Sequence, residues 1–196
     1  MALASSLIRY AIREVALQSK PVELVEASPK ATVPVLVLSD GHVIEQSLDI
    51  MLWVLAQHDP QQWLADDQAT TNAMLNLIAT NDGPFKFHLD RMKYANRYAE
   101  AVPEQHRAEA VKLLQPLEER LSGAPYLFGD QPGLADIAIF PFIRQFAHAD
   151  AVAFAALPLS HLQSWLKQWE SSALFESVMT KHIVWQPEHE VIYVQG

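Results

Sequence analysis

The chain has 196 residues, of which 50% are hydrophobic and 19% charged, a balance typical of a folded protein with one large or two small domains. Its formal net charge of −9 disfavours nucleic-acid binding, which relies on lysine and arginine to neutralise phosphates. The absence of cysteine excludes disulfides, cysteine-ligated zinc and a thiolate nucleophile. No apolar run approaches the ~20 residues of a membrane span, and residues 1–8 lack the features of a signal peptide, so we expect a cytoplasmic protein with no membrane association.

The first 57 residues show an α/β pattern. Alternation over residues 8–17 predicts a strand, and Pro21 opens a short helix over 21–27. Residues 33–38 form a β-prone apolar run, and the turn Ser39-Asp40-Gly41 leads to a returning strand at 43–44. Helical spacing of leucine and methionine then predicts a helix over residues 45–56. The order strand, helix, hairpin, helix is typical of an α/β domain.

After Asp59-Pro60 the sequence becomes helical in character. Apolar stripes predict helices over residues 66–81, 84–100, 103–121, 136–148, 162–169 and 174–179. Pro116 should kink or split the third of these, and Gly123 should end it. We therefore expect an α/β domain over 1–57 and an all-helical domain over 62–196, with tail residues 191–194 docked against the helical domain.

Motifs of nucleophilic, nucleotide-binding or metal chemistry are not found. The sequence contains no G-x-S-x-G, no G-x-G-x-x-G and no phosphate-binding loop of the Walker type. The eight histidines form no H-x-x-x-H or H-E-x-x-H pair, so we expect no metal site. Tyr94, Arg91 and His88 could face a second substrate, but we prefer a core stripe of Phe85, Leu89 and Met92 with a solvated opposite face.

Two short segments, residues 28–36 and 40–50, carry the most information. A proline after Val33 removes one backbone donor and can hold a cis peptide, which would leave the Val33 backbone free to pair with an extended ligand. Gln46 and Ser47 begin a helix, where free amides and the helix dipole favour a bound carboxylate. Taken singly, Pro34 could merely shape a turn and Ser47 could merely cap the helix.

Taken together, these residues resemble the thioredoxin-like half of the glutathione S-transferase superfamily, of the omega-like or bacterial glutaredoxin-2-like type. Thirteen residues separate Lys20 from Val33, and thirteen separate Val33 from Gln46, as in that family. The resemblance implies that Lys20 meets the glycine carboxylate of glutathione and that Val33, before cis-Pro34, pairs with the cysteinyl backbone. It also implies that Gln46 and Ser47 hold the γ-glutamyl end. The run Gly133-Leu134-Ala135-Asp136 is similar to the buried capping box of the family's helical domain.

The sequence departs from the family pattern in three ways. Gln46 stands where the family has glutamate, so the side chain that would meet the ammonium group of the ligand carries no negative charge. Gly133 stands where the family has serine or threonine, so the capping side chain is absent. The chain also resembles a shortened family member that lacks the first strand and the residue that activates the thiol. The place of that strand would be taken by residues 8–15 shifted inward, by a segment of another subunit, or by local disorder; a truncated gene model is the other explanation.

The expected fold class is α/β plus all-α, with an incomplete thioredoxin-like domain followed by a helical domain. The resemblance implies glutathione as co-substrate and conjugation to a small electrophile, or glutathione-dependent thiol exchange, in a homodimer. No catalytic residue is assigned. Ser5 and Ser6 are the only hydroxyls near the right end of the chain. The alternative is a non-catalytic binding or assembly module with the same fold.

Overall fold

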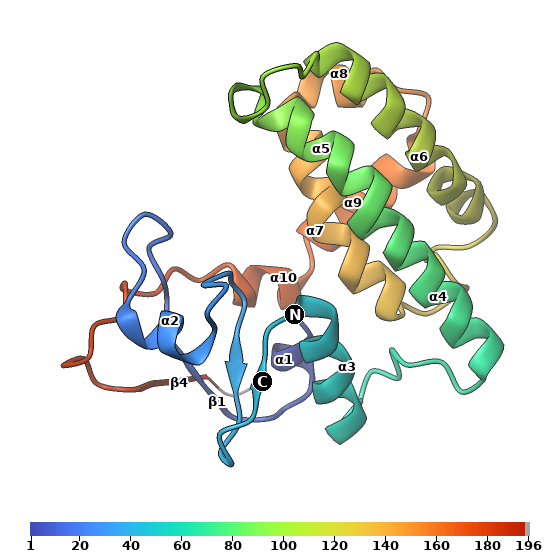
Figure 1. Ribbon diagram of the computed structural model, residues 1–196. Coiled ribbons are helices and arrows are strands. Elements are labelled where there is room, and N and C mark those ends of the chain that lie inside the picture. The colour runs from blue at the N-terminus through green and yellow to red at the C-terminus, as the bar shows by residue number, and fades with distance from the viewer. Residues whose placement is uncertain (195–196) are drawn as a thin grey trace. The chain divides into compact units, whose positions relative to one another are not determined.

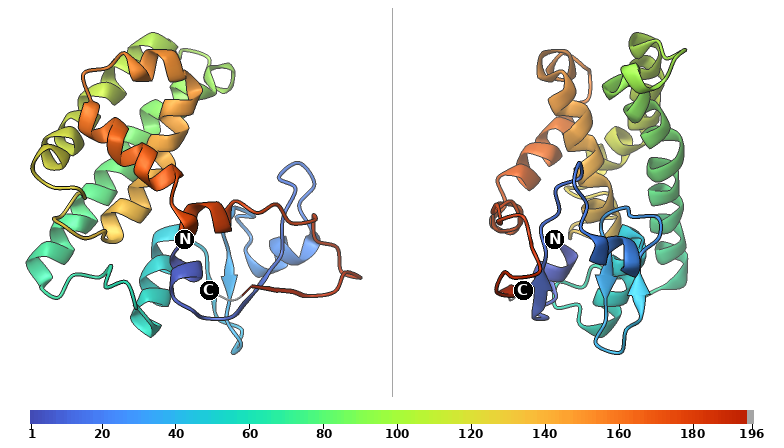
Figure 2. Two further views of the ribbon diagram at one scale, coloured as in Figure 1. Left: turned by 180° about the vertical axis from the view of Figure 1, so that it is seen from behind. Right: turned by 60° about the vertical axis from the view of Figure 1, so that its left-hand side comes forward.

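A computed structural model describes residues 1–194 (Figure 1). The chain divides into two compact units. The first, called here the α/β unit, contains residues 1–61 and 173–196, and the second, the helical unit, contains residues 62–172. Both marked chain ends therefore belong to the α/β unit (Figure 2). The sequence pattern had assigned the last 24 residues to the helical domain, whereas the fold groups them with the first 61.

Five of the helices and strands in the α/β unit follow the order expected for its N-terminal part. These are β1 (Tyr10–Ile12), α2 (Val22–Ala27), β2 (Leu36–Val37), β3 (Val43–Ile44) and α3 (Ser47–Gln57). A short α1 (Ala2–Ser5) precedes them, and α10 (Ala173–Val178) and β4 (Ile192–Val194) come from the C-terminal end. Helix α1 packs against α3 and α10. His58 Nδ1 lies 2.6 Å from the Ser6 carbonyl oxygen, which ties the end of α3 to the end of α1.

Strands β2 and β3 form the predicted hairpin. Leu36 pairs with Ile44 and Val37 with Val43 in antiparallel register. The His42 amide donates to the Asp40 carboxylate at 2.9 Å, and Gly41 takes a φ of 87°, a conformation that favours glycine. Local turn chemistry therefore favours this hairpin.

The C-terminal tail corrects one expectation from the sequence. Instead of docking on the helical domain, β4 pairs antiparallel with β1, with Tyr10 opposite Val194 and Ile12 opposite Ile192. The guanidinium of Arg9 lies 4.0 Å from the ring centre of Tyr193, and that of Arg13 lies 4.5 Å from Trp185. Because backbone groups of a strand need partners, the tail supplies what β1 would otherwise lack. The partner of the first strand is thus a distant segment of the same chain.

The helical unit contains α4 (Gln68–Thr80), α5 (Lys86–Lys93), α6 (Pro103–Gly123), α7 (Leu134–Ala149), α8 (Ala151–Ala155) and α9 (Ser160–Glu170). A π-helical turn over Asn81–Phe85 joins α4 directly to α5, and a 3-10 turn, Ala95–Arg97, follows α5. The sequence predicted separate helices over 66–81 and 84–100. The helix is not interrupted between them, because the wider π turn accommodates the ring of Pro84. Pro116 does not split α6. No helix in residues 1–194 is long and apolar enough to cross a membrane.

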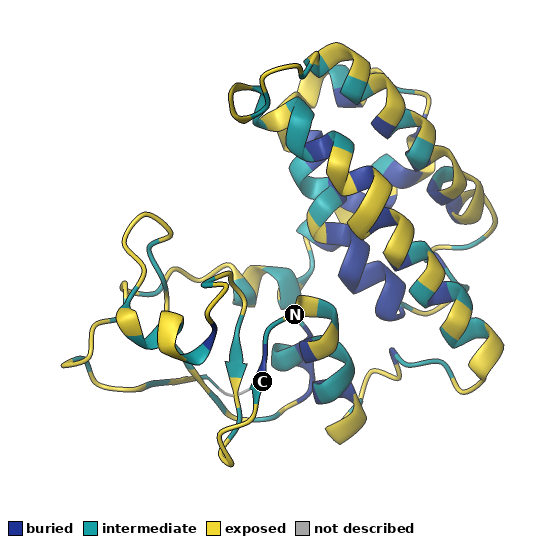
Figure 3. Cartoon of the chain, in the orientation of Figure 1, coloured by how far each residue is buried: buried dark blue, intermediate teal, exposed yellow. Residues whose placement is uncertain are grey.

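The core of the helical unit centres on α7, where ten residues are buried (Figure 3). Phe140 lies 6.2 Å from Trp165 and 5.9 Å from Trp169, centre to centre, so α7 and α9 interlock through aromatic rings. Phe146 packs in the same way against Phe85 and Phe154. Burial is continuous from Leu134 to Phe140, in agreement with the apolar sequence of the first half of α7.

Asp136 is the buried polar centre of this core. Its carboxylate accepts hydrogen bonds from the Leu127 amide at 3.1 Å, the Gly133 amide at 3.0 Å and the Trp165 indole at 2.8 Å. Burial raises the pKa of Asp136, and the three donors oppose that shift. Gly133 provides no side-chain cap, so only the Asp136 half of the capping box forms.

Candidate functional site

The Val33–Pro34 peptide bond is cis, as the sequence suggested. Both residues are exposed in the loop before β2. In the part of the chain that the structure describes, the Val33 backbone makes no hydrogen bond within the protein. Its amide and carbonyl are therefore available to an extended ligand that pairs with it like a strand.

Gln46 and Ser47 lie at the exposed start of α3. Gln46 is the N-cap residue with extended backbone (φ −99°, ψ 136°), and its side chain makes no capping hydrogen bond. The first intrahelical bond runs from the Ile50 amide to the Gln46 carbonyl at 2.9 Å, so the amides of the preceding turn lack an intrahelical partner. Ser47 is the first helical residue and does not cap, which rules out the simpler interpretation of this serine.

A cavity of about 470 Å³ lies beside this helix start, a volume in the range of small-molecule sites. It is lined by Gln46 and Asp49 of α3, by residues of β3 and its flanks, and by the loop residue Lys30; the full lining is Lys30, His42, Val43, Ile44, Glu45, Gln46 and Asp49. Of the five predicted binding residues, only Gln46 lines the cavity. Lys20, Val33, Pro34 and Ser47 do not, although all four are exposed.

Glu45 is held in place at the wall of this cavity. The buried Ser28 hydroxyl donates to Glu45 Oε1 at 2.5 Å, and Lys30 Nζ lies 3.3 Å from Oε2. These hydrogen bonds, that from Ser28 first, hold the pKa of Glu45 below its usual value. Glu45 is therefore ionised, with Lys30 as its ion-pair partner. Asp49, by contrast, has no ion-pair partner among residues 1–194, so its charge faces the cavity uncompensated.

Sequence reasoning missed six of the seven cavity residues, among them the polar Lys30, His42, Glu45 and Asp49. Two signals were present. Lys30 and Glu45 lie within the segments 28–36 and 40–50, and Asp49 lies one turn from Gln46 on the same helix. What the sequence lacked was the fold of the 28–45 loop, which places Ser28 against Glu45 over a separation of 17 residues.

The two serines near the N-terminal end are unsuited to activate a thiol. Ser5 and Ser6 are buried, and their hydroxyls donate to the carbonyls of Ala2 at 3.1 Å and Leu3 at 2.8 Å. Ser6 Oγ also accepts from the Ile8 amide at 3.3 Å. Their hydrogen-bonding capacity is thus used within and just after α1.

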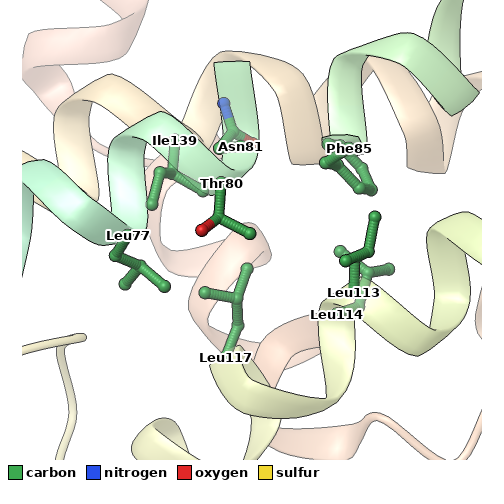
Figure 4. Close-up of a pocket in the computed structure, with 8 residues that line it drawn as sticks. All are labelled: Leu77, Thr80, Asn81, Phe85, Leu113, Leu114, Leu117 and Ile139. Carbon is green, nitrogen blue, oxygen red and sulfur yellow. The ribbon is translucent and has the colours of Figure 1, made fainter. Parts of the chain in front are cut away.

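The helical unit contains a small hollow. Figure 4 shows a hollow between α4, α6 and α7 of only about 10 Å³, which is about the size of one water molecule. Phe85 of the π turn and Leu89 of α5 are buried, which confirms the core stripe, whereas Met92 is half-buried. The Arg91 guanidinium stacks 3.5 Å from the Phe87 ring centre and 4.4 Å from that of Tyr98. On the exposed face of α5, the Arg91 side chain is therefore engaged with the rings of Phe87 and Tyr98.

Comparison with known proteins gives a consistent result. The family model of the glutathione S-transferase N-terminal domain matches residues 1–57, and that of the C-terminal domain matches residues 61–169. No curated protein matches the chain in sequence.

Many solved structures share the fold. BphK, a bacterial glutathione S-transferase solved as a ternary complex, is 20% identical with a TM-score of 0.76, covering 91% of this chain and 90% of its own. A glutathione S-transferase from Rhodospirillum rubrum F11 is 21% identical with a TM-score of 0.68, at 88% and 82% coverage. A Pseudomonas fluorescens Pf-5 family member with two glutathione bound is 19% identical with a TM-score of 0.68, at 80% and 74% coverage.

Proposed function

Because this chain belongs to the glutathione S-transferase superfamily, we propose that its α/β unit binds reduced glutathione at the start of α3. The observation that carries the proposal is the exposed N-terminal turn of α3, where neither Gln46 nor Ser47 is used as a cap and a cavity lies alongside. Free amides at a helix start bind carboxylates. The glutathione-bound relative from Pseudomonas fluorescens is consistent with this ligand class.

The proposed placement follows the chemistry of each group. The γ-glutamyl carboxylate accepts hydrogen bonds from the first amides of α3 and from the Ser47 hydroxyl. The cysteinyl backbone pairs with the unpartnered backbone of Val33, next to cis-Pro34. The exposed Lys20 side chain attracts the glycine carboxylate.

Asp49 has a specific part in this proposal. Glutamine at position 46 can accept a hydrogen bond from the γ-glutamyl ammonium but brings no charge, and charged hydrogen bonds are about twice as strong as neutral ones. Asp49 lines the same cavity and has no ion pair among the described residues, whereas Glu45 is engaged by Ser28 and Lys30. Asp49 therefore supplies the negative charge that Gln46 lacks.

The proposed reaction is attack of the glutathione thiolate on a small electrophile, or glutathione-dependent thiol exchange, by a cytoplasmic homodimer. Such chemistry requires a donor that lowers the thiol pKa. The engagement of Ser5 and Ser6 within α1 favours a second candidate, a binding module of the same fold that holds glutathione without turnover. Conjugation of glutathione to a chloronitrobenzene separates the two, because only the transferase shows protein-dependent product formation.

Calorimetric titration with reduced glutathione tests the binding site. We expect saturable binding that Ser47→Ala and Asp49→Asn each weaken several-fold. Ser160→Ala is the matched control, because Ser160 is likewise an exposed first residue of an 11-residue helix without a capping bond, but in the helical unit. No saturable binding by the folded chain, or equal binding by Ser47→Ala and wild type, would contradict the proposal.

A further inference from the structure

Two histidines from different helices meet in the helical unit. His88 lies within α5 and His106 in the first turn of α6, and their Nδ1 atoms are 2.9 Å apart. The ring centres are 5.1 Å apart, so the rings approach each other through these nitrogens rather than by stacking. Both side chains are half-buried and remain accessible to an ion. Eighteen residues separate them in the sequence, so no local spacing could reveal the pair.

The Nδ1 atoms of the two rings share a single proton. A neutral imidazole has one N–H and one lone pair, so at this distance one Nδ1–H donates to the other Nδ1. In the described chain neither ring makes any other hydrogen bond. When the donating ring carries its proton on Nε2 instead of Nδ1, both Nδ1 lone pairs are available to one metal ion, and imidazole nitrogen suits divalent zinc, cobalt and nickel.

Glu109 provides an acidic third group. It lies three residues after His106 on α6, a spacing that puts both side chains on one helix face. Among residues 1–194 its ion pair is with Lys112 at 2.6 Å, and both side chains are at least half exposed, so the pair is weak.

We propose that His88 Nδ1, His106 Nδ1 and the Glu109 carboxylate bind one zinc-class divalent ion between α5 and α6, with water completing the shell. Metal–nitrogen distances of about 2.0–2.1 Å place two tetrahedral ligands roughly 3.3 Å apart, so the two rings need to separate by only a few tenths of an ångström. Among residues 1–194 no three such groups already stand in ligand geometry, so Glu109 must leave Lys112 when the ion binds. The ion would link α5 to α6, independently of the α/β unit.

Zinc titration of the full-length chain without a histidine tag tests the site. We expect one Zn²⁺ per chain, a rise in unfolding temperature with Zn²⁺, and a visible absorption band with Co²⁺ typical of tetrahedral coordination. His88→Gln and His106→Gln should each weaken Zn²⁺ binding at least 10-fold, and Glu109→Gln several-fold. His148→Gln is the matched control, since it removes another half-exposed histidine, one paired with Glu170, and should leave binding unchanged.

Two results would overturn the proposal. One is the absence of stoichiometric Zn²⁺ binding by the wild-type chain. The other is a wild-type affinity retained by His88→Gln or His106→Gln, each shown by circular dichroism to be folded. Binding unchanged in Glu109→Gln would contradict its place as the third ligand.

Discussion

The two units of the molecule differ sharply in how much core they build. Of the thirty buried hydrophobic side chains in the described residues, twenty-five lie in the helical unit and five in the α/β unit. The exposed large hydrophobic side chains show the reverse distribution, with eleven of fourteen in the α/β unit. Because apolar burial drives folding, the helical unit carries most of the stability. The proposed glutathione site therefore lies on the more weakly built unit, where ligand binding adds most to order.

The largest expected effect is on the buried centre of the helical unit. Asp136→Ala strands the donors of Leu127, Gly133 and Trp165, and each stranded buried donor costs on the order of 1–3 kcal/mol, so we expect about 4 kcal/mol less unfolding free energy. Asp136→Asn should cost about half as much by the same measure, because its oxygen can still accept from Leu127 and Trp165. Urea unfolding measures both. A loss below ~1 kcal/mol for the alanine variant would contradict the central role of this carboxylate.

Removal of the C-terminal strand should affect only the α/β unit. Deletion of residues 181–196 removes the β1–β4 ladder and the contacts of Arg9 and Arg13, together worth about 2 kcal/mol. Hydrogen exchange of residues 9–14 should then accelerate at least tenfold, while amides of α7 keep their protection. Equal acceleration in α7 would show that the two units do not unfold separately.

Elements specified by local contacts could be predicted from the sequence, whereas contacts between distant residues could not. The β2–β3 hairpin was predictable because Asp40 and Gly41 specify their own turn, and α7 was predictable because its apolar run is continuous. The pairing of Ile192–Val194 with Tyr10–Ile12, and the His88–His106 contact, were not. Each joins residues whose local sequence has no signal for the other. Of the five predicted binding residues only Gln46 lines the cavity; Asp49 follows it on the same helix, whereas Lys30 reaches the cavity through the fold of its loop.

Acid should weaken the helical unit through Glu118. This α6 residue accepts hydrogen bonds from the His161 and Leu162 amides at the start of α9, at 3.1 and 2.8 Å. Burial raises the pKa of Glu118, but the hydrogen bonds from Leu162 and His161 together outweigh burial and lower it below its usual 4.5. The ionised carboxylate therefore stabilises the fold above about pH 4.5 and loses that effect as pH falls through the lowered pKa.

Glu118→Gln tests this effect. We expect a loss of about 1 kcal/mol at pH 7 and a shallower decline of stability between pH 5 and 3 than in wild type. Asp66→Asn is a suitable control, because Asp66 is a carboxylate of the same unit with no hydrogen bond to a helix start. Identical acid profiles for Glu118→Gln and wild type would exclude Glu118 as the responsible group.

The smallest effect is expected at Gly133. Serine there would add the missing cap of α7, but its Cβ would lie 2.8 Å from the Met74 methyl group. Because that methyl ends a flexible side chain, we expect a net change within about 1 kcal/mol, measured by thermal unfolding. A loss well above this range would show that Met74 cannot move.

The most direct test of the account is amide hydrogen exchange of the full chain with and without saturating reduced glutathione. The account predicts slower exchange at residues 46–50, at the start of α3, and around Val33, with the amides of α7 unchanged. Ser47→Ala should reduce the protection at α3, and Ser160→Ala should not. Unchanged exchange throughout the α/β unit, or protection confined to the helical unit, would contradict a glutathione site at the start of α3.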